Sequence, residues 1–391
     1  MSAQLSSRAA PAVAPPRVIH LVDNLDTTAV ETWLVRMLRY AVENGVAVDW
    51  TFYDTLGKPG ALDRQAHDLG AKVVHSPAPL SSKRAFVAAL RAELRRGGYQ
   101  VLHAHHDLVS AVYLLAAWGL PIEKRIVHVH NADESMLTPS AVKQAVLRPL
   151  FRTLCLSRAD LIVGNSNHSL DTFLAGRQRR PGRDLVHHIG IDPGPFANSA
   201  ADRSAFRRAQ NLPDDARLVL FAGRLVPEKN PVFAVDVVAE MRRQDARVVG
   251  VFAGSGSLEG DVRRRAAERG VAGAMRYLGW RGDVADVMNC CDLFILPHPE
   301  RPMEGFGIAV VEAQLAGLRL LLSLGIADDP LLPTAAVRRL SLDRTPQEWA
   351  AAAMELLAEP APSWPATLAA FERSPMAMDR ALRALLALHR Q

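Results

Sequence analysis

The sequence predicts an α/β fold, with two Rossmann-like, doubly wound domains facing each other across a cleft. Short apolar runs alternate with longer amphipathic segments, as strands and helices do in repeated βα units. A cluster of turn residues at positions 189–195 interrupts this alternation, and the same pattern then starts again. A chain of 391 residues is long enough for two domains of ordinary size. In open α/β folds such a cleft is the default ligand site.

Eleven apolar runs predict the strands of two parallel sheets. In the first half they are residues 18–22, 46–53, 72–75, 101–104, 125–129 and 161–163. In the second half they are residues 218–222, 248–253, 275–278, 293–296 and 319–322. The main helical segments between them are residues 31–42, 83–96, 141–156, 231–243, 258–269, 308–316 and 346–358. The segment 308–316 is apolar nearly all round, which predicts a buried helix.

The interruption of the pattern places the domain boundary near residue 196. Residues 1–16 are rich in alanine, proline and serine, so we expect a disordered tail. Residues 17–196 then form the N-terminal domain and residues 197–375 the C-terminal domain. The last helix, about 376–391, has few local partners and is expected to cross back to the N-terminal domain.

Composition excludes several classes of protein. Three cysteines without metal-ligand spacing argue against a disulfide scaffold or a structural zinc site and fit a reducing cytoplasm. The longest apolar stretch, residues 108–122, is interrupted by Ser110 and Gly119 and is shorter than the roughly 20 residues that span a bilayer. We therefore expect a cytoplasmic protein without a membrane-spanning helix.

Basic residues are concentrated in the first half of the chain. Residues 1–198 contain 22 Lys and Arg against 17 Asp and Glu, whereas residues 199–391 contain 24 of each. The first half is therefore expected to meet something anionic. Two helical segments carry many of these cations, namely Lys83, Arg84, Arg91, Arg95 and Arg96 on one and Lys143, Arg148 and Arg152 on the other. They are either solvated helix faces or a surface that docks reversibly on anionic lipid at the inner face of the plasma membrane.

One loop joins a strand to a helix and carries two cations. Arg224 and Lys229 lie in this loop, and Pro231 suits the first turn of the helix that follows. A guanidinium, an ammonium and the amide groups at a helix start make a cradle for a diphosphate. The alternative interpretation is a loop with two solvated charges.

A pair of glutamates separated by seven residues is the stronger signal. Glu304 precedes a Gly-Phe-Gly turn, and Glu312 lies on the apolar helix that follows. A carboxylate on a buried helix is costly unless a partner satisfies it, and neighbouring sugar hydroxyls could do so. A structural arginine paired with Glu312 is the alternative.

These motifs resemble those of the retaining GT-B glycosyltransferases of family 4. The glutamate pair matches the family's E-x7-E signature, and residues 223–230 look like its donor-diphosphate loop. Residues 191–192, 277–283 and 312–318 match further motifs in family order, so the resemblance covers nearly the whole chain. Residues 312–323, with Trp349, look most like the exopolysaccharide- and capsule-biosynthesis branch.

The resemblance implies transfer of a hexose or N-acetylhexosamine from a nucleotide diphosphate sugar, expected to be UDP-linked, to a glycan or lipid-linked acceptor. The C-terminal domain would bind the donor and the N-terminal domain the acceptor. Neither a cofactor nor a catalytic metal is implied, and the absence of an Asp-x-Asp pair argues against a metal-dependent GT-A enzyme. No nucleic-acid partner is expected.

The resemblance also assigns residues to roles. Catalytic roles fall to His130, Glu304, Arg224 and Lys229. The expected donor-binding residues are Gly223, Arg224, Lys229, Gly254, Trp280, Arg281, Gly305, Phe306, Gly307 and Glu312. The expected acceptor-side residues are Thr28, Ala29, His105 and Asn131. Arg281 is either a base contact or a surface charge.

The strand-end histidines have a structural alternative as well. His105 and His130 follow strands at the edge where open α/β sheets bind ligands, or they only cap those strands. His103 and His128 alternate away from them and are expected to pack between sheet and helix.

The sequence departs from the family pattern at two places. Thr28 and Ala29 lie where the family usually has a Gly-Gly pair, so side chains occupy the space that a close backbone approach would need. The segment 298–302 replaces the family's shorter Pro-Ser approach to the first glutamate. A sugar-nucleotide epimerase or phosphorylase, and a catalytically silent scaffold, are the alternative functions. An NAD-dependent oxidoreductase is excluded because no glycine follows the first strand.

Overall fold

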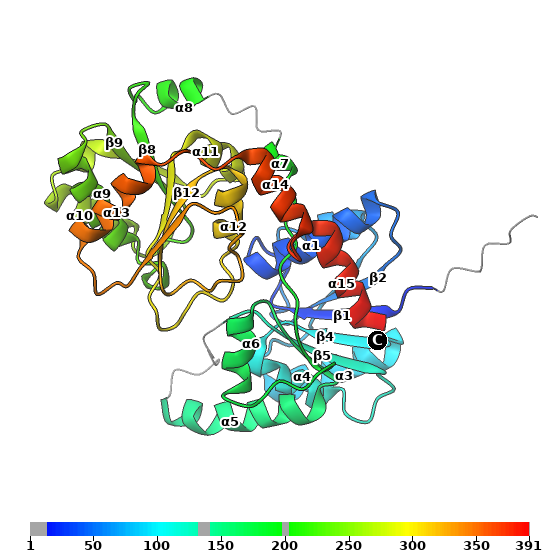
Figure 1. Cartoon of the computed structure of the whole chain (residues 1–391). Helices are drawn as coiled ribbons and strands as arrows, with labels where there is room; N and C mark the ends of the chain where they lie inside the picture. The colour runs from blue at the N-terminus through cyan, green and yellow to red at the C-terminus, as the bar shows by residue number, and fades with distance from the viewer. Residues whose placement is uncertain (1–13, 132–140, 198–202, 391) are drawn as a thin grey trace, which may run out of the picture. The chain divides into compact units, whose positions relative to one another are not determined.

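A computed structural model describes residues 14–131, 141–197 and 203–390. It contains two parallel sheets with helices packed against them, so the predicted α/β fold is confirmed (Figure 1). The predicted disordered tail lies outside the described residues as far as position 13.

The first sheet has seven strands in the order β3-β2-β1-β4-β5-β6-β7. The strands are β1 (Arg17–Val22), β2 (Asp49–Asp54), β3 (Lys72–His75), β4 (Val101–Ala104), β5 (Lys124–Val129), β6 (Leu161–Gly164) and β7 (Asp184–Val186). Strand order reverses between β1 and β4, and open sheets bind ligands at such a point. The sequence pattern predicted six of these strands and missed β7, which is only three residues long and follows a run of turn residues.

The second sheet has six strands in the order β10-β9-β8-β11-β12-β13. The strands are β8 (Arg217–Ala222), β9 (Val248–Ala253), β10 (Met275–Gly279), β11 (Leu293–Leu296), β12 (Arg319–Ser323) and β13 (Val337–Leu340). The first five match the predicted runs. The residues of β8, β9, β11 and β12 are largely buried because helices cover both faces, whereas β10, at the sheet edge, is only partly buried. The sequence missed β13, because Arg338 and Arg339 break its apolar pattern at the sheet edge.

Helices connect the strands in both halves of the chain. In the first half they are α1 (Ala29–Glu43), α2 (Asp63–Asp68), α3 (Lys83–Gly97), α4 (Ser110–Ala116), α5 (Ala141–Arg158), α6 (Asn167–Leu174) and α7 (Gly194–Ala197). In the second half they are α8 (Arg203–Ala209), α9 (Pro231–Gln244), α10 (Glu259–Glu268), α11 (Val284–Cys290), α12 (Ile308–Leu315), α13 (Pro346–Ala358), α14 (Trp364–Arg373) and α15 (Met378–Arg390).

Trp349 anchors α13 in the second half of the chain. The helix begins with a capping box in which the Thr345 hydroxyl accepts from the Glu348 amide and the Glu348 carboxylate accepts from the Thr345 amide. Trp349 is completely buried one turn into the helix, where its ring meets that of Phe233 edge to face at 5.3 Å. Its indole N–H donates to the carbonyl oxygen of Ser341 at 3.1 Å, so the polar end of the ring is satisfied as well.

The structure comprises two compact units. Unit 1 contains Met1–His128, Met136–Ile162 and Leu382–Gln391, and unit 2 contains Val129–Ser135 and Val163–Ala381. Helix α15 therefore begins in unit 2 and continues into unit 1. The predicted boundary at residue 196 stays a prediction. Among the described residues, no helix combines the length and the apolar character needed to cross a bilayer.

Candidate active site

The predicted diphosphate loop joins β8 to α9 in unit 2. Strand β8 ends at Ala222, a short 3-10 turn covers Pro227–Lys229, and α9 begins at Pro231 as the sequence predicts. Asn230 adopts the left-handed conformation, with φ of 50°, which turns the chain sharply into the helix. The free amide groups of the first turn of α9 therefore follow Lys229 directly.

Two glycines after β9 allow a second loop to lie against this one. A Cβ atom on Gly254 would be only 1.9 Å from the carbonyl oxygen of Gly223, and one on Gly256 would be 2.3 Å from that of Leu225. The Leu225 amide also donates to the Ser255 carbonyl at 3.0 Å. The two loops thus meet backbone to backbone, which explains why the donor motif pairs Gly223 with Gly254.

The two cations of the loop have different environments. Arg224 is exposed, and its guanidinium makes no hydrogen bond or ion pair with the residues that the structure describes, so it can bind an anion. The Lys229 ammonium donates to the carboxylate of Glu304, and both side chains are less than one-fifth exposed, at 19% and 16%. Burial, and then the neighbouring charge of Arg224, lower the pKa of Lys229 to about 8.

Glu304 is held by groups that follow two neighbouring strands. Its backbone amide donates to the Gly325 carbonyl at 2.8 Å, beyond the end of β12. His298, beyond the end of β11, places Nε2 3.7 Å from the Glu304 carboxylate. Burial lowers the pKa of His298 to about 4, with Lys229 acting in the same direction, so this imidazole is neutral near pH 7. In the sequence, His298 is apparent only as part of a departure from the family pattern. Its position directly after a strand nevertheless indicates a candidate binding-site residue.

The turn after Glu304 leads into α12 as predicted. Phe306 is buried, and Gly307 has φ of 85° at the residue before the helix, a conformation that glycine adopts without strain. The expectation that α12 is a buried helix holds for most of its residues, which are Val310, Val311, Ala313, Gln314 and Leu315. Ile308 and Glu312 are both partly exposed, and at a spacing of four residues they lie on one face of the helix.

His130 lies beside the glutamate loop within unit 2. A Cβ on Gly305 would be 2.3 Å from the His130 carbonyl oxygen, so the two backbones are in close contact. Asn165 donates its side-chain amide to that same oxygen at 2.8 Å, and the Ser166 hydroxyl donates to the Gly305 carbonyl. The structure therefore brings the backbone of His130 to the Glu304 loop, and its catalytic role stays a prediction. Asn131, the next residue, is exposed.

His188 is a further residue near this loop that the sequence analysis missed. Its ring centroid is 5.9 Å from that of Phe306, and its Nε2 is 3.0 Å from an Asp329 carboxylate oxygen. Both side chains line a pocket of unit 2 together with Met303, which precedes Glu304. The consecutive histidines at 187 and 188, just before the turn cluster, were the available signal.

The segment that follows β10 carries the residues expected near the base. Trp280 is 68% exposed, so its indole face is open for stacking. Arg281 forms an ion pair with Asp283, two residues further on, and the Nε–Oδ1 distance is 2.7 Å. This pairing agrees with the interpretation of Arg281 as a surface charge. To contact the base of the donor, Arg281 would have to leave Asp283.

Unit 1 contains the other acceptor-side residues. Thr28 is the residue before α1 and its hydroxyl donates to the Glu31 carboxylate, while Ala29 starts the helix. Burial raises the pKa of Glu31 to about 7, against the opposing hydrogen bond from its own backbone.

His105 departs from the expected position at the open strand end. It is buried, and its Nε2 lies 3.1 Å from Nδ1 of His20. Because β4 ends at Ala104, the two-residue alternation stops there and His105 stacks on His103 instead of pointing away from it. His103 and His128 are buried as expected.

Comparison with known proteins agrees with this geometry. The family model "Glycosyltransferase Family 4" matches residues 30–194, and the model "Glycosyl transferases group 1" matches residues 202–333. The Bacillus subtilis protein EpsF, named as a glycosyltransferase, is 26% identical over 338 residues, which are 85% of this chain and 86% of EpsF. A D-inositol 3-phosphate glycosyltransferase of Stackebrandtia nassauensis is 29% identical over 75% of this chain and 70% of its own.

Solved structures show the same fold over nearly the whole chain. The structure of Anabaena HepE in complex with UDP-glucose has a TM-score of 0.73 at 18% identity, covering 95% of this chain and 99% of HepE. WaaG, a glycosyltransferase involved in lipopolysaccharide biosynthesis, has a TM-score of 0.65 at 13% identity, covering 95% and 97%.

Two Rossmann-like halves that match these enzymes over their full length define a GT-B fold. The chain belongs to the family 4 glycosyltransferases, enzymes that take the transferred sugar from a nucleotide sugar.

Proposed function

We propose that this enzyme transfers a hexose or N-acetylhexosamine from a UDP-sugar to a glycan or lipid-linked acceptor, with retention at the anomeric carbon and without a catalytic metal. The cell process we propose is synthesis of exopolysaccharide or another surface polysaccharide. The observation that carries the proposal is the contact between Lys229 and Glu304.

The chemistry of a sugar nucleotide explains why this contact is informative. One oxygen atom joins the β-phosphate of the donor to its sugar, so a phosphate-binding cation and a sugar-binding carboxylate must lie close together. Lys229 and Glu304 come from loops 75 residues apart and touch. When the donor binds, the phosphate takes the place of Glu304 as partner of Lys229, and the freed carboxylate accepts hydrogen bonds from sugar hydroxyls. His130, beside Gly305, approaches the same sugar.

Charge on the departing diphosphate is then stabilised by protein groups alone. Arg224 supplies an exposed guanidinium, Lys229 a half-buried ammonium, and the first turn of α9 its free amides. Preorganised donors of this kind are the largest catalytic contribution in many transferases. Glu312, on the partly exposed face of α12, would accept hydrogen bonds from the ribose.

The nucleotide and the pathway rest on similarity to other proteins. Anabaena HepE binds UDP-glucose, and WaaG acts in lipopolysaccharide biosynthesis. Residues 312–323 and Trp349 resemble the exopolysaccharide branch of the family. These three likenesses support UDP and a surface polysaccharide over other nucleotides and products.

The test is a donor panel with and without acceptor. The protein is incubated with UDP-, GDP- and ADP-sugars in excess chelator, and nucleotide release and the anomeric configuration of the product are measured. We expect acceptor-dependent release of UDP and an α-linked product from an α-linked donor. Conversion of the donor without acceptor would indicate an epimerase or phosphorylase instead, and neither binding nor turnover would indicate a silent scaffold, the alternative suggested by Thr28 and Ala29.

We also propose that unit 1 docks reversibly on anionic lipid, beside a lipid-linked acceptor. Four exposed apolar side chains lie on α4, on the turn that follows it and on α5, and we propose that they act together as an apolar patch, made of Leu115, Trp118, Val146 and Leu150. The Arg158 guanidinium lies 4.1 Å from the centre of the Trp118 ring, which puts a cation beside that member of the patch. Helix α4 packs against α5, so these residues share one region of unit 1.

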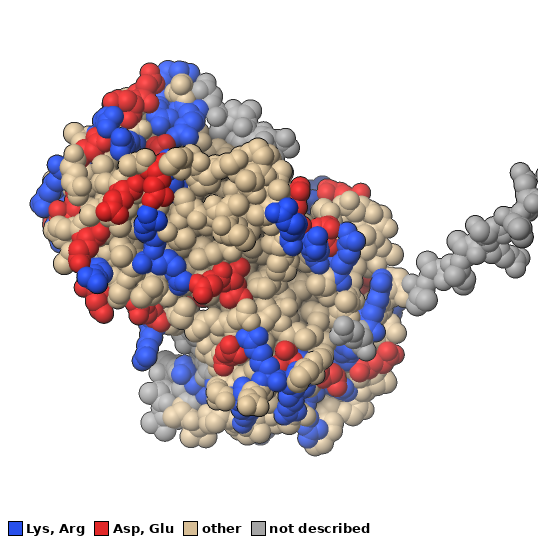
Figure 2. Space-filling view, viewed as in Figure 1, with Lys and Arg blue, Asp and Glu red and all other residues tan. Residues whose placement is uncertain are grey.

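The basic residues of α3 are less available for binding anionic lipid than the sequence indicated. Arg91 donates to the Ala116 and Trp118 carbonyls, and Arg96 pairs with Glu93, so both act within the fold. On the face seen in Figure 2, basic side chains are interspersed with acidic ones. The apolar patch therefore carries the docking proposal. Flotation with anionic vesicles at low salt should recover the wild type, and Trp118→Ser with Val146→Ser should abolish recovery. Equal recovery of the variant would refute docking through this patch.

A further inference from the structure

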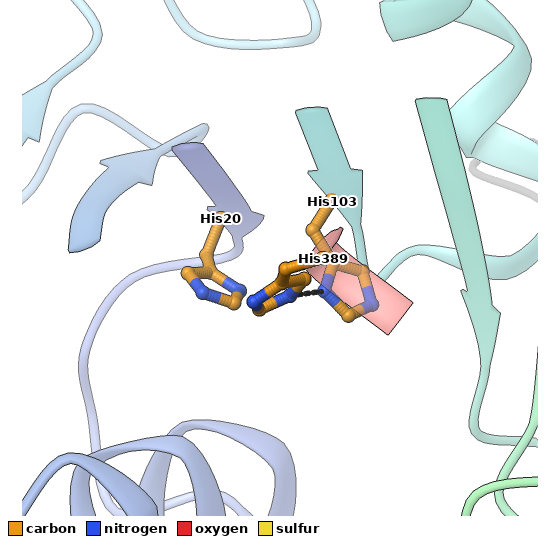
Figure 3. A group of neighbouring side chains, drawn as sticks. All are labelled: His20, His103 and His389. Carbon is orange, nitrogen blue, oxygen red and sulfur yellow. Dashed lines mark hydrogen bonds between the residues drawn. The ribbon is translucent and has the colours of Figure 1, made fainter. Parts of the chain in front are cut away.

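Five histidines form a buried cluster in unit 1. His20 lies on β1, His103 on β4, His128 on β5 and His389 near the end of α15, while His105 follows β4. Their exposed fractions range from 0% to 4%. Figure 3 shows the rings of His20, His103 and His389 side by side, although His389 is 286 residues from His103 in the sequence. This group is called the histidine cluster below.

Ring nitrogens pair with one another inside the cluster. Nδ1 of His103 is 3.0 Å from Nε2 of His389, and Nε2 of His103 is 3.2 Å from Nδ1 of His128. Nδ1 of His20 is 3.1 Å from Nε2 of His105. Nε2 of His20 is buried and has no hydrogen-bond partner among the described residues. A buried polar nitrogen without a partner is costly, so this atom needs an explanation.

His20 and His103 are neutral at physiological pH. Burial lowers the pKa of His20 to about 3, and burial with the neighbouring histidines lowers that of His103 well below its usual value. A neutral imidazole keeps one nitrogen with a free lone pair, which is the form that binds metal ions. Several neutral rings close together provide nitrogen lone pairs that can bind a metal ion, without the repulsion that charged rings would cause.

We propose that His20, His103 and His389 bind one divalent transition-metal ion, with Zn²⁺ as the probe, and that this ion fixes the end of α15 to the first sheet. One nitrogen from each of the three rings lies within 4.8 Å of the other two. Nitrogens bound tetrahedrally at about 2.0–2.1 Å are about 3.3 Å apart. The Nδ1–Nε2 distance of 3.0 Å between His103 and His389 would therefore change by only a few tenths of an ångström.

The outer histidines complete the geometry of the site. Nε2 of His105 is 3.1 Å from Nδ1 of His20, so a fourth imidazole lies directly beside the three proposed ligands. His128 bonds Nε2 of His103, which leaves Nδ1. Ligating histidines in metal sites use their second nitrogen for such a bond, which fixes the tautomer and the ring orientation. Imidazole nitrogens favour Zn²⁺, Cu²⁺ and Ni²⁺ over Mg²⁺ or Ca²⁺.

The site is structural and does not depend on the proposed transferase activity. Binding needs no net loss of protons, because each neutral ring moves its single N–H to the nitrogen that faces away from the ion. Since all three rings are buried, the ion enters while the chain folds or while the end of α15 is detached. Metal loading must therefore be tried during expression as well as on the folded protein.

The test measures metal content and thermal stability of the full-length protein without a histidine tag. It is produced in zinc-supplemented medium, or stripped with a chelator and reloaded with Zn²⁺, then dialysed and analysed by mass spectrometry for metal. We expect one zinc ion per chain and a Tm about 5 °C higher than that of the stripped protein. Co²⁺ loading should give the visible absorption of tetrahedral cobalt. A wild-type chain that carries no metal after both loading routes, with no cobalt absorption, overturns the proposal.

Two variants and a matched control locate the ion. His389→Gln removes the ligand on α15, and His20→Phe keeps a ring of similar size without nitrogen. Both should lose the bound zinc and the Tm increase. His67→Gln on α2, where the side chain is 81% exposed, should keep both. Zinc retained by both cluster variants would overturn the proposal, and the wild-type cobalt spectrum decides it if neither variant folds.

Discussion

Replacing Lys229 by methionine should weaken UDP binding and remove the loss of affinity at alkaline pH. In the structure the Lys229 ammonium donates to the Glu304 carboxylate. In the complex with UDP it would donate to the diphosphate instead. A hydrogen bond between charged groups contributes about 1.5–3 kcal/mol. Its loss should raise the Kd for UDP about 10- to 150-fold.

The pH dependence follows from the lowered pKa. Free Lys229 has a pKa of about 8, and a bound diphosphate favours the charged form, so the pKa rises when UDP binds. Affinity is then constant below pH 8 and falls above it, by about tenfold near pH 9. His298 does not contribute in this range, because its pKa is about 4.

Calorimetric titration with UDP between about pH 7 and about pH 9 tests this difference. Lys229→Met leaves the Glu304 carboxylate without its cation, so Lys229→Met with Glu304→Gln is measured as well. Lys58→Met, at an exposed lysine of unit 1, is the matched control and should behave like the wild type. If Lys229→Met lost affinity with the same slope as the wild type above pH 8, Lys229 would not be the titrating group and the reasoning would be refuted.

Three further predictions concern the same unit. Gly254→Ala should weaken UDP binding at least tenfold, because its Cβ would lie 1.9 Å from a backbone oxygen of the diphosphate loop, while Gly260→Ala, with nothing within 4 Å, should leave calorimetric binding unchanged. Trp349→Ala should cost about 3–5 kcal/mol in urea unfolding, since the ring is completely buried, and a cost under about 1 kcal/mol would contradict its anchoring role. Glu304→Ala should lower kcat and leave UDP affinity nearly unchanged, whereas Glu312→Gln should raise the donor KM and weaken UDP binding; the reverse pattern would exchange their roles.

The sequence was sufficient to predict where helices begin when the local hydrophobic pattern and the backbone preferences of single residues agree. Pro231 predicted the first turn of α9, and Gly307 the turn into α12, because each residue has a restricted or unusual backbone preference. The edge strand β13 was not predicted, because Arg338 and Arg339 interrupt the apolar run from which a strand is recognised.

Contacts between distant segments could not be predicted from local pattern. Nothing near Lys229 indicates that Glu304 neutralises it, and nothing near His103 indicates that His389 bonds to it. The partly exposed face of α12 is a similar case. The helix is apolar nearly all round in sequence. Ile308 and Glu312 are partly exposed because of how the neighbouring elements pack, which the local sequence does not show.

The division of α15 between the two units has a practical consequence for anyone who wishes to produce them separately. Unit 1 needs the last ten residues of the chain as well as its beginning, so no single cleavage point in the sequence releases both units intact. A fragment ending near residue 196 would lack His389 and its contact with His103 of β4. Expression of the N-terminal half should therefore include residues 378–390, joined by a linker or supplied as a peptide.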